Sequence, residues 1–146
     1  MHFAYSRRMH SAYEEDAMFE TLINAWHDAV NNRDLAAAEA TVTDRVEVSG
    51  PRGAHTISAR EFADWIIRSG IRLHPLSAHR VDDVTTVIEQ EATWPDDADA
   101  DAVTTPPILV ATMFKIRDGG LSTIRRFDSL HDALREAGNE TPQPGQ

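Results

Sequence analysis

The sequence predicts an α+β fold in which helices pack on a curved, mainly antiparallel sheet. Two periodicities lead to this prediction. In the first third of the chain, apolar residues recur every three or four positions, as in a helix that lies on a core. After residue 71 they alternate with polar residues instead, as in strands with one buried face. Because the helices mostly precede the strands, the regular alternation of a parallel sheet is not expected.

Composition places the chain among ordinary globular proteins. Its 146 residues suffice for one domain with a sizeable core, and 41% of them are hydrophobic. The net charge of −10 disfavours binding to a phosphate backbone, so no nucleic-acid partner is expected. No apolar run approaches the ~20 residues of a membrane-spanning helix, and no signal-like start is seen. We therefore expect a cytoplasmic protein without a membrane partner.

The sequence contains no cysteine, which excludes disulfides and thiolate chemistry. His74 and His79 are five positions apart in a predicted strand and therefore lie on opposite faces, a poor arrangement for shared metal ligation. No metal and no cofactor is expected.

The first helix is expected to begin at a capping box formed by Ser11 and Glu14 and to end near Asn31. Asp34 is expected to cap a short second helix over residues 35–40. We expect a flexible segment over residues 1–10, one domain over 11–138 and a flexible tail over 139–146. The apolar stripe of the first helix consists of Phe19, Leu22, Ile23, Trp26, Ala29 and Val30.

A strand is expected at residues 45–49, followed by a turn at 50–53. Ser58 and Glu61 form a second capping box, which predicts a third helix that ends at Gly70. A polar loop is expected at 95–102 and a hairpin turn at 117–120. Ser129 is expected to cap a last helix that ends at Gly138. The remaining strands are predicted at residues 73–80, 85–94, 108–116 and 121–128.

With these elements in order, the chain resembles the SnoaL-like, ketosteroid-isomerase-like branch of the NTF2-like superfamily. The resemblance implies a cone-shaped, cystatin-like α+β barrel with an apolar pocket at its wide end. It also implies a homodimer packed through the outer face of the sheet. The segments that carry it are residues 26–35, 46–51, 62–65, 114–120 and 125–128.

The catalytic positions of ketosteroid isomerase are not reproduced. Aligned on Asp34 and Phe114, the tyrosine, the base aspartate and the protonated aspartate of that enzyme correspond to Trp26, Gly50 and Thr112 here. Glycine has no group that accepts a proton, so catalysis by that mechanism is not expected.

If chemistry is retained, the candidate catalytic residues are Arg126, Asp128 and His27. Alternation puts Arg126 and Asp128 on one face of the last strand, where an inward orientation would let them bind a carboxylate or orient water. The alternative is a surface ion pair, which contributes little. The pKa of a histidine suits acid–base work, but the offset of His27 from the apolar stripe favours a position on the surface.

The candidate ligand-binding residues are expected to surround the pocket. Trp26 either donates its indole N–H to a ligand or finds a backbone carbonyl in the core. Trp65 has the same two interpretations and is expected nearer the core. Gln90 and Thr112 are polar residues on apolar strand faces, where they either orient a ligand or, for threonine, simply favour a strand. The apolar wall is expected to include Val48, Phe62 and Phe114.

Three hypotheses for the function follow. The first is a domain that binds a small hydrophobic organic ligand without catalysis. The second is a small isomerase, dehydratase, cyclase or hydrolase that uses acid–base residues of the last strand. The third is an interaction module that uses its exposed sheet face. An ionisable side chain in the cavity is required by the second hypothesis alone.

Overall fold

A computed structural model of the chain describes residues 2–50, 53–94 and 106–140. Within these residues four helices accompany one six-stranded sheet, which confirms the α+β prediction. The elements in chain order are α1 (His2–Asn31), α2 (Leu35–Ala40), β1 (Val42–Gly50), β2 (Gly53–Ser58), α3 (Ala59–Ser69), β3 (Arg72–Asp82), β4 (Thr85–Thr93), β5 (Ile108–Arg117), β6 (Gly120–Phe127) and α4 (Leu130–Glu140).

The strands lie in the order β2-β1-β6-β5-β4-β3. The pairs β1–β2, β3–β4, β4–β5 and β5–β6 are antiparallel, whereas β1 runs parallel to β6. The parallel pair brings together distant parts of the chain, because four strands and a helix separate β1 from β6 in the sequence. The sheet curves but remains open, with β2 and β3 at its edges, so the predicted barrel is not closed.

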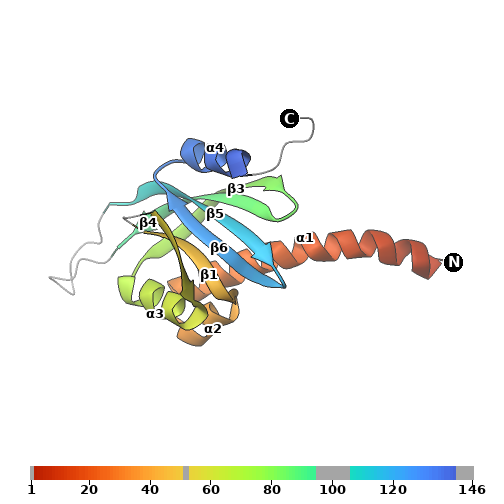
Figure 1. Cartoon of the computed structure of the whole chain (residues 1–146), viewed down its shortest axis with the longest axis horizontal. Helices are drawn as coiled ribbons and strands as arrows, with labels where there is room; N and C mark the ends of the chain where they lie inside the picture. The colour runs from red at the N-terminus through yellow and green to blue at the C-terminus, as the bar shows by residue number, and fades with distance from the viewer. Residues whose placement is uncertain (1, 51–52, 95–105, 141–146) are drawn as a thin grey trace.

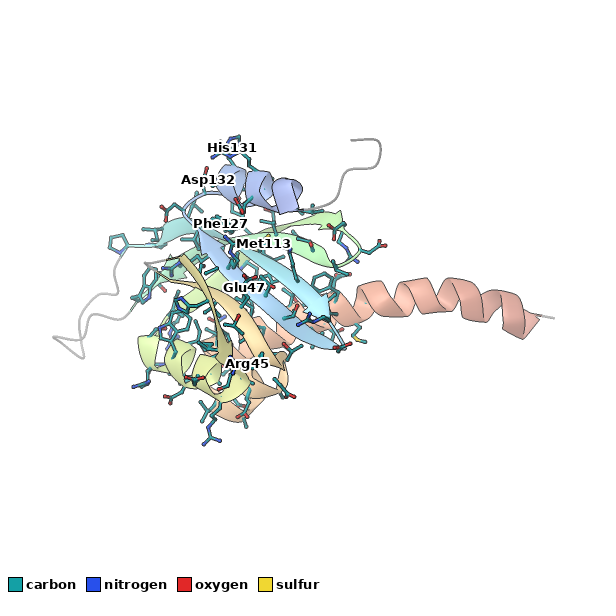
Figure 2. The ribbon with its side chains drawn as sticks, in the orientation of Figure 1. Arg45, Glu47, Met113, Phe127, His131 and Asp132 are labelled. Carbon is teal, nitrogen blue, oxygen red and sulfur yellow. The ribbon has the colours of Figure 1, made fainter. Side chains whose placement is uncertain are left out.

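Helices lie on both faces of the sheet (Figure 1). The face that α1 and α3 cover carries the main core, in which Trp26, Phe62 and Phe114 are almost fully buried. Helix α4 covers the opposite face, where Ala133 and Ala137 pack on Val87, Ala111 and Met113. Figure 2 shows Met113 and Phe127 on the sheet side of α4 and His131 on the side that faces away.

Several predicted helix ends and turns are confirmed. The Asp34 side chain accepts from the Ala37 N–H at the start of α2. Ser58 and Glu61 form a complete capping box, and Gly70 ends α3 with a φ of 70°. Asp118 and Gly119 have φ values of 53° and 79°, which is the left-handed pair that a two-residue hairpin turn requires.

Two predicted helix boundaries are wrong, and one strand was not predicted. Helix α1 begins at His2, so Ser11 lies within it rather than at its N-cap. Helix α4 continues through Gly138 to Glu140. Strand β2 was not expected, because its residues are exposed or half-buried and show no apolar alternation. The predicted turn at 50–53 and the polar loop at 95–102 fall mainly outside the described residues.

One side chain ties the end of α1 to the edge strand β3. The Asn31 side chain accepts from the Leu73 backbone N–H and donates to the Leu73 carbonyl, both at 2.8 Å. The amide therefore pairs with Leu73 as a neighbouring strand would, at a position where β3 has no further strand beside it. This contact fixes the end of α1 beside Leu73, which lines a cavity between the helices and the sheet.

Candidate functional site

A cavity of about 550 Å³ lies between α1, α3 and the inner face of the sheet. This volume falls within the range of about 300–1,000 Å³ that is usual for small-molecule sites. Its walls are mostly apolar, with aromatic residues from two helices and polar residues from β1, β5, β6 and the residue that follows β6. The lining residues are Trp26, Ser49, Phe62, Trp65, Ile66, Ile71, Leu73, Thr112, Ile124, Arg126 and Asp128.

Aromatic rings build one wall. Trp26 stacks on Phe62 with ring centroids 6.4 Å apart and meets Phe114 edge-on at 5.1 Å. The Trp26 side chain is only 1% exposed, yet its indole N–H has no hydrogen-bond partner among the described residues. Because a buried Trp N–H usually has a partner, this donor marks a place where a ligand acceptor would be stabilised.

Behind this wall a chain of hydrogen bonds leads from α1 to the cavity. The His27 Nδ1 lies 2.8 Å from the Ile23 carbonyl oxygen, and its Nε2 lies 2.8 Å from the Gln90 side-chain nitrogen. The Gln90 side-chain oxygen accepts from the Thr112 hydroxyl at 2.7 Å. All three side chains are buried, and Thr112 lines the cavity. Both ends of the Gln90 amide are therefore engaged within the protein.

Burial lowers the pKa of His27 below its ordinary value of 6.5. Its hydrogen bond to the Ile23 carbonyl and the nearby Asp28 carboxylate act in the opposite direction, but they are smaller effects. The imidazole is consequently neutral near pH 7. Its expected surface position is wrong, because His27 is four residues after Ile23 and three before Val30 and so shares the buried stripe.

Arg126 and Asp128 both line the cavity and are exposed, which places them towards its opening. The Arg126 guanidinium lies 5.4 Å from the centre of the Trp94 ring. Its backbone is held by Ser49, whose hydroxyl accepts from the Arg126 N–H at 2.8 Å and donates to the Arg126 carbonyl at 3.3 Å. Trp65, expected nearer the core, is 47% exposed and forms part of the rim.

The alternation along β6 decides which side chains enter the cavity. Ile124 and Arg126 of β6 face inwards, as does Asp128 directly after the strand, whereas Arg125 lies near Glu136 of α4 on the outer face, with an N–O distance of 4.0 Å. The neighbouring β5 contributes Thr112 to the cavity, and the buried Phe114 packs behind Trp26.

Six of the ten predicted site residues line this cavity, namely Trp26, Phe62, Trp65, Thr112, Arg126 and Asp128. His27, Gln90 and Phe114 support it from behind, and Val48 lines an adjoining groove beside Trp65. The sequence interpretation missed Ser49, whose place between Val48 and Gly50 at the end of a predicted strand was the available signal.

Other parts of the described chain offer less for a small apolar molecule. A hollow of about 510 Å³ on the outer face is lined by charged side chains, among them Arg45 and Glu47, which Figure 2 marks. No group of three or more His, Asp or Glu residues with metal-binding geometry occurs in the described part. None of its helices is long and apolar enough to cross a membrane.

Comparison with known proteins identifies the fold. No model of a protein family matches the sequence, and no curated protein matches it either. Several solved structures do match. An NTF2-like protein of unknown function from Cytophaga hutchinsonii is 9% identical, with a TM-score of 0.60 over 76% of this chain and 89% of the other.

Two further structures have chemical descriptions. A putative polyketide cyclase from Xanthomonas campestris is 18% identical over 83% of this chain and 97% of its own, with a TM-score of 0.62. The second is SalBIII, an epoxide hydrolase/cyclase-like enzyme with a role in pyran ring formation in the polyether salinomycin. It is 16% identical, with a TM-score of 0.62 over 77% of this chain and 92% of the other. The chain therefore has the NTF2-like fold, as the resemblance implied.

Proposed function

Because a fold of this kind carries many unrelated activities, we propose a function from the cavity itself: the protein binds a small, mostly apolar organic molecule that carries a polar group. The observation that carries this proposal is the buried indole N–H of Trp26: the residue belongs to the cavity lining, and this N–H has no partner among the described residues. Leaving such a donor unpaired costs about 1–3 kcal/mol, so an acceptor on a ligand that bonds to it would stabilise the complex.

Two other features support this proposal. The cavity walls offer Phe62, Ile66 and Leu73 to an apolar skeleton. Structures of the same fold include a putative polyketide cyclase and an epoxide hydrolase/cyclase-like enzyme, whose names imply small organic substrates and so support a small-molecule ligand here.

The test is a titration followed by the indole signals in ¹H–¹⁵N spectra. The probes are naphthalene, 2-methoxynaphthalene and 2-naphthol, which share one ring system and differ in the polar group. We expect the Trp26 signal, assigned with Trp26→Phe, to move furthest with the two oxygen-bearing probes. The Trp65 signal at the rim serves as a local reference. If neither indole signal moves with any probe at millimolar concentration, the proposal is wrong.

The proposed function does not include catalysis of the ketosteroid-isomerase type, because the residues at the three catalytic positions do not support it. Gly50 is the last residue of β1, where that mechanism would need a carboxylate base. Trp26 and Thr112 occupy the two remaining positions, and neither titrates in the range that proton abstraction at neutral pH requires.

A second candidate function is hydrolysis of a hydrophobic epoxide. It is favoured by the presence of both Arg126 and Asp128 in the cavity lining. In this reaction the Asp128 carboxylate takes a proton from water while the water oxygen attacks an epoxide carbon. The carbon–oxygen bond breaks, the guanidinium of Arg126 stabilises the alkoxide, and solvent then protonates it.

Styrene oxide turnover tests this candidate. We expect Asp128→Asn to lower the rate by about 10²–10⁴-fold, which is the usual range for loss of a general base. Asp132→Asn is the matched control, because Asp132 lies on α4 and does not line the cavity. Equal turnover by both variants, or none by the unchanged protein, leaves binding as the function.

A further inference from the structure

We infer that the cavity selects a ligand whose polar group both accepts and donates a hydrogen bond, such as a hydroxyl, because two residues of its lining retain complementary groups: the indole N–H of Trp26 is an unpaired donor, and the hydroxyl oxygen of Thr112 is an acceptor. This inference rests on the proposed binding function and deepens it. It makes Thr112 a specificity-determining residue, and it makes Gln90 and His27 positioning residues that act through Thr112.

The end of the hydrogen-bond chain that lies furthest from the cavity, at the Ile23 carbonyl, decides which group donates and which accepts in each of its bonds. The Ile23 carbonyl oxygen can only accept, so the His27 Nδ1 must carry the proton that they share. In the neutral imidazole the Nε2 then has no hydrogen and must accept. Its partner at 2.8 Å is the Gln90 side-chain nitrogen, which donates. The orientation of the Gln90 amide thus follows from a backbone carbonyl on α1.

The same direction continues into the cavity. With its nitrogen turned towards His27, Gln90 turns its oxygen towards Thr112, and this oxygen can only accept. The single hydroxyl hydrogen of Thr112 is therefore already used. What the hydroxyl retains is an oxygen lone pair, so a ligand can bond to it only by donating.

The other polar lining groups do not change this requirement. The Ser49 hydroxyl is engaged with both backbone groups of Arg126. Arg126 and Asp128 are exposed, whereas Trp26 and Thr112 are buried. An oxyanion can only accept, so the acceptor on Thr112 would not suit it. A ketone or an ether also only accepts, so it could bond to the Trp26 N–H but not to the Thr112 oxygen. A hydroxyl can accept from the indole and donate to Thr112.

The comparison of 2-naphthol with its methyl ether tests the inference. An apolar cavity without an acceptor would favour the ether, because the ether buries one more methyl group. We expect the opposite order, with 2-naphthol binding about tenfold more tightly, as one additional hydrogen bond allows. Equal affinities or tighter binding of the ether would overturn the inference and leave the proposed function intact.

Variants locate the effect. Thr112→Val removes the acceptor at nearly constant shape, so the preference for 2-naphthol should disappear, whereas Thr112→Ser should retain it. Melting curves of both variants check that they fold. Should Thr112→Val fail to fold, Gln90→Met serves in its place: it frees the Thr112 hydrogen, so 2-methoxynaphthalene should gain affinity relative to 2-naphthol. If no naphthalene probe binds, the inference falls together with the proposed function.

A measurement without any ligand tests the chain of hydrogen bonds directly. Imidazole ¹⁵N chemical shifts report which nitrogen of His27 carries the proton. We expect a protonated Nδ1 and an unprotonated Nε2 at pH 7.5, with the assignment made by His27→Gln. A proton on Nε2 would reverse the direction at Gln90 and contradict the acceptor role of Thr112, whatever the probes do.

Discussion

Among the described residues, His27 is a buried titratable side chain that links folding to pH. Burial lowers its pKa in the folded protein below the ordinary value of 6.5, which the unfolded chain retains. Between the two values the unfolded chain therefore binds a proton that the folded protein does not, so stability rises with pH in this interval. Above about pH 6.5 His27 is neutral in both states, so the stability of the fold with a neutral His27 is fully present. This stability is lost as the pH falls through and below 6.5, because the unfolded chain then gains a proton that the folded protein does not.

Urea unfolding between pH 5 and 8 measures this link. We expect the free energy of unfolding of the unchanged protein to decrease below pH 6.5 more steeply than that of His27→Gln, which cannot bind the proton. The other histidines are common to both proteins, so their contribution cancels in the difference between the two curves. Parallel curves would show that His27 is not the linked group.

Asn31 makes a second residue-scale prediction, because its amide satisfies both backbone groups of Leu73. Asn31→Ala would leave the N–H and the carbonyl of this buried residue without their partners. We expect a loss of about 1–3 kcal/mol in the free energy of unfolding. The exposed neighbour provides the control, since Asn32→Ala should change stability by less than about 0.5 kcal/mol.

The site residues show what a sequence can and cannot locate. The hairpin before β6 has a clear turn signal, and alternation correctly grouped Ile124 with Arg126 and Asp128 on one face. Which face points inwards depends on the pairing of the whole sheet, and no local pattern contains it. The contact between His27 and Gln90 joins residues 63 positions apart, so neither residue alone indicated a shared network.

At the scale of elements, α1 and α3 contain the same capping signal with different outcomes. Ser58 caps α3 in a complete box, whereas Ser11 lies inside α1. We therefore expect Ser58→Ala to cost about 1 kcal/mol, while Ser11→Ala should be neutral or slightly stabilising, because alanine is the better helix former. Thermal unfolding of the two variants separates these cases. A comparable loss with Ser11→Ala would mean that the helix begins at that residue.

The predicted strands succeeded where side chains are buried and failed where they are exposed. Strand β4 alternates between Ile88 on the inner face and Val87 on the outer face, and this pattern predicted it. Strand β2 lies at the sheet edge with exposed side chains, so its pairing with β1 is made by the backbone and leaves little hydrophobic signal. Whether such a segment forms a strand therefore depends on the strand beside it as much as on its own residues.

At the scale of the whole molecule, the sheet has an apolar patch on each face and each has its own cover. The inner patch holds the cavity, and α4 closes the outer patch by packing Ala133 and Ala137 on Val87, Ala111 and Met113. Small side chains allow α4 to approach the sheet closely. The outer cover contains no cavity residue, so the two faces can be disturbed separately.

Ala133→Glu tests this separation. A carboxylate in place of a fully buried methyl group would be desolvated against the sheet, so we expect α4 to undock and expose the outer patch. Faster hydrogen exchange in α4, stronger binding of a hydrophobic dye and concentration-dependent association should follow. His131→Glu places the same charge on the exposed side of α4 and should change none of these (Figure 2). Because the cavity lies on the other face, the response of the Trp26 indole to 2-naphthol should persist in Ala133→Glu at low protein concentration, and its loss would show that the two faces are coupled.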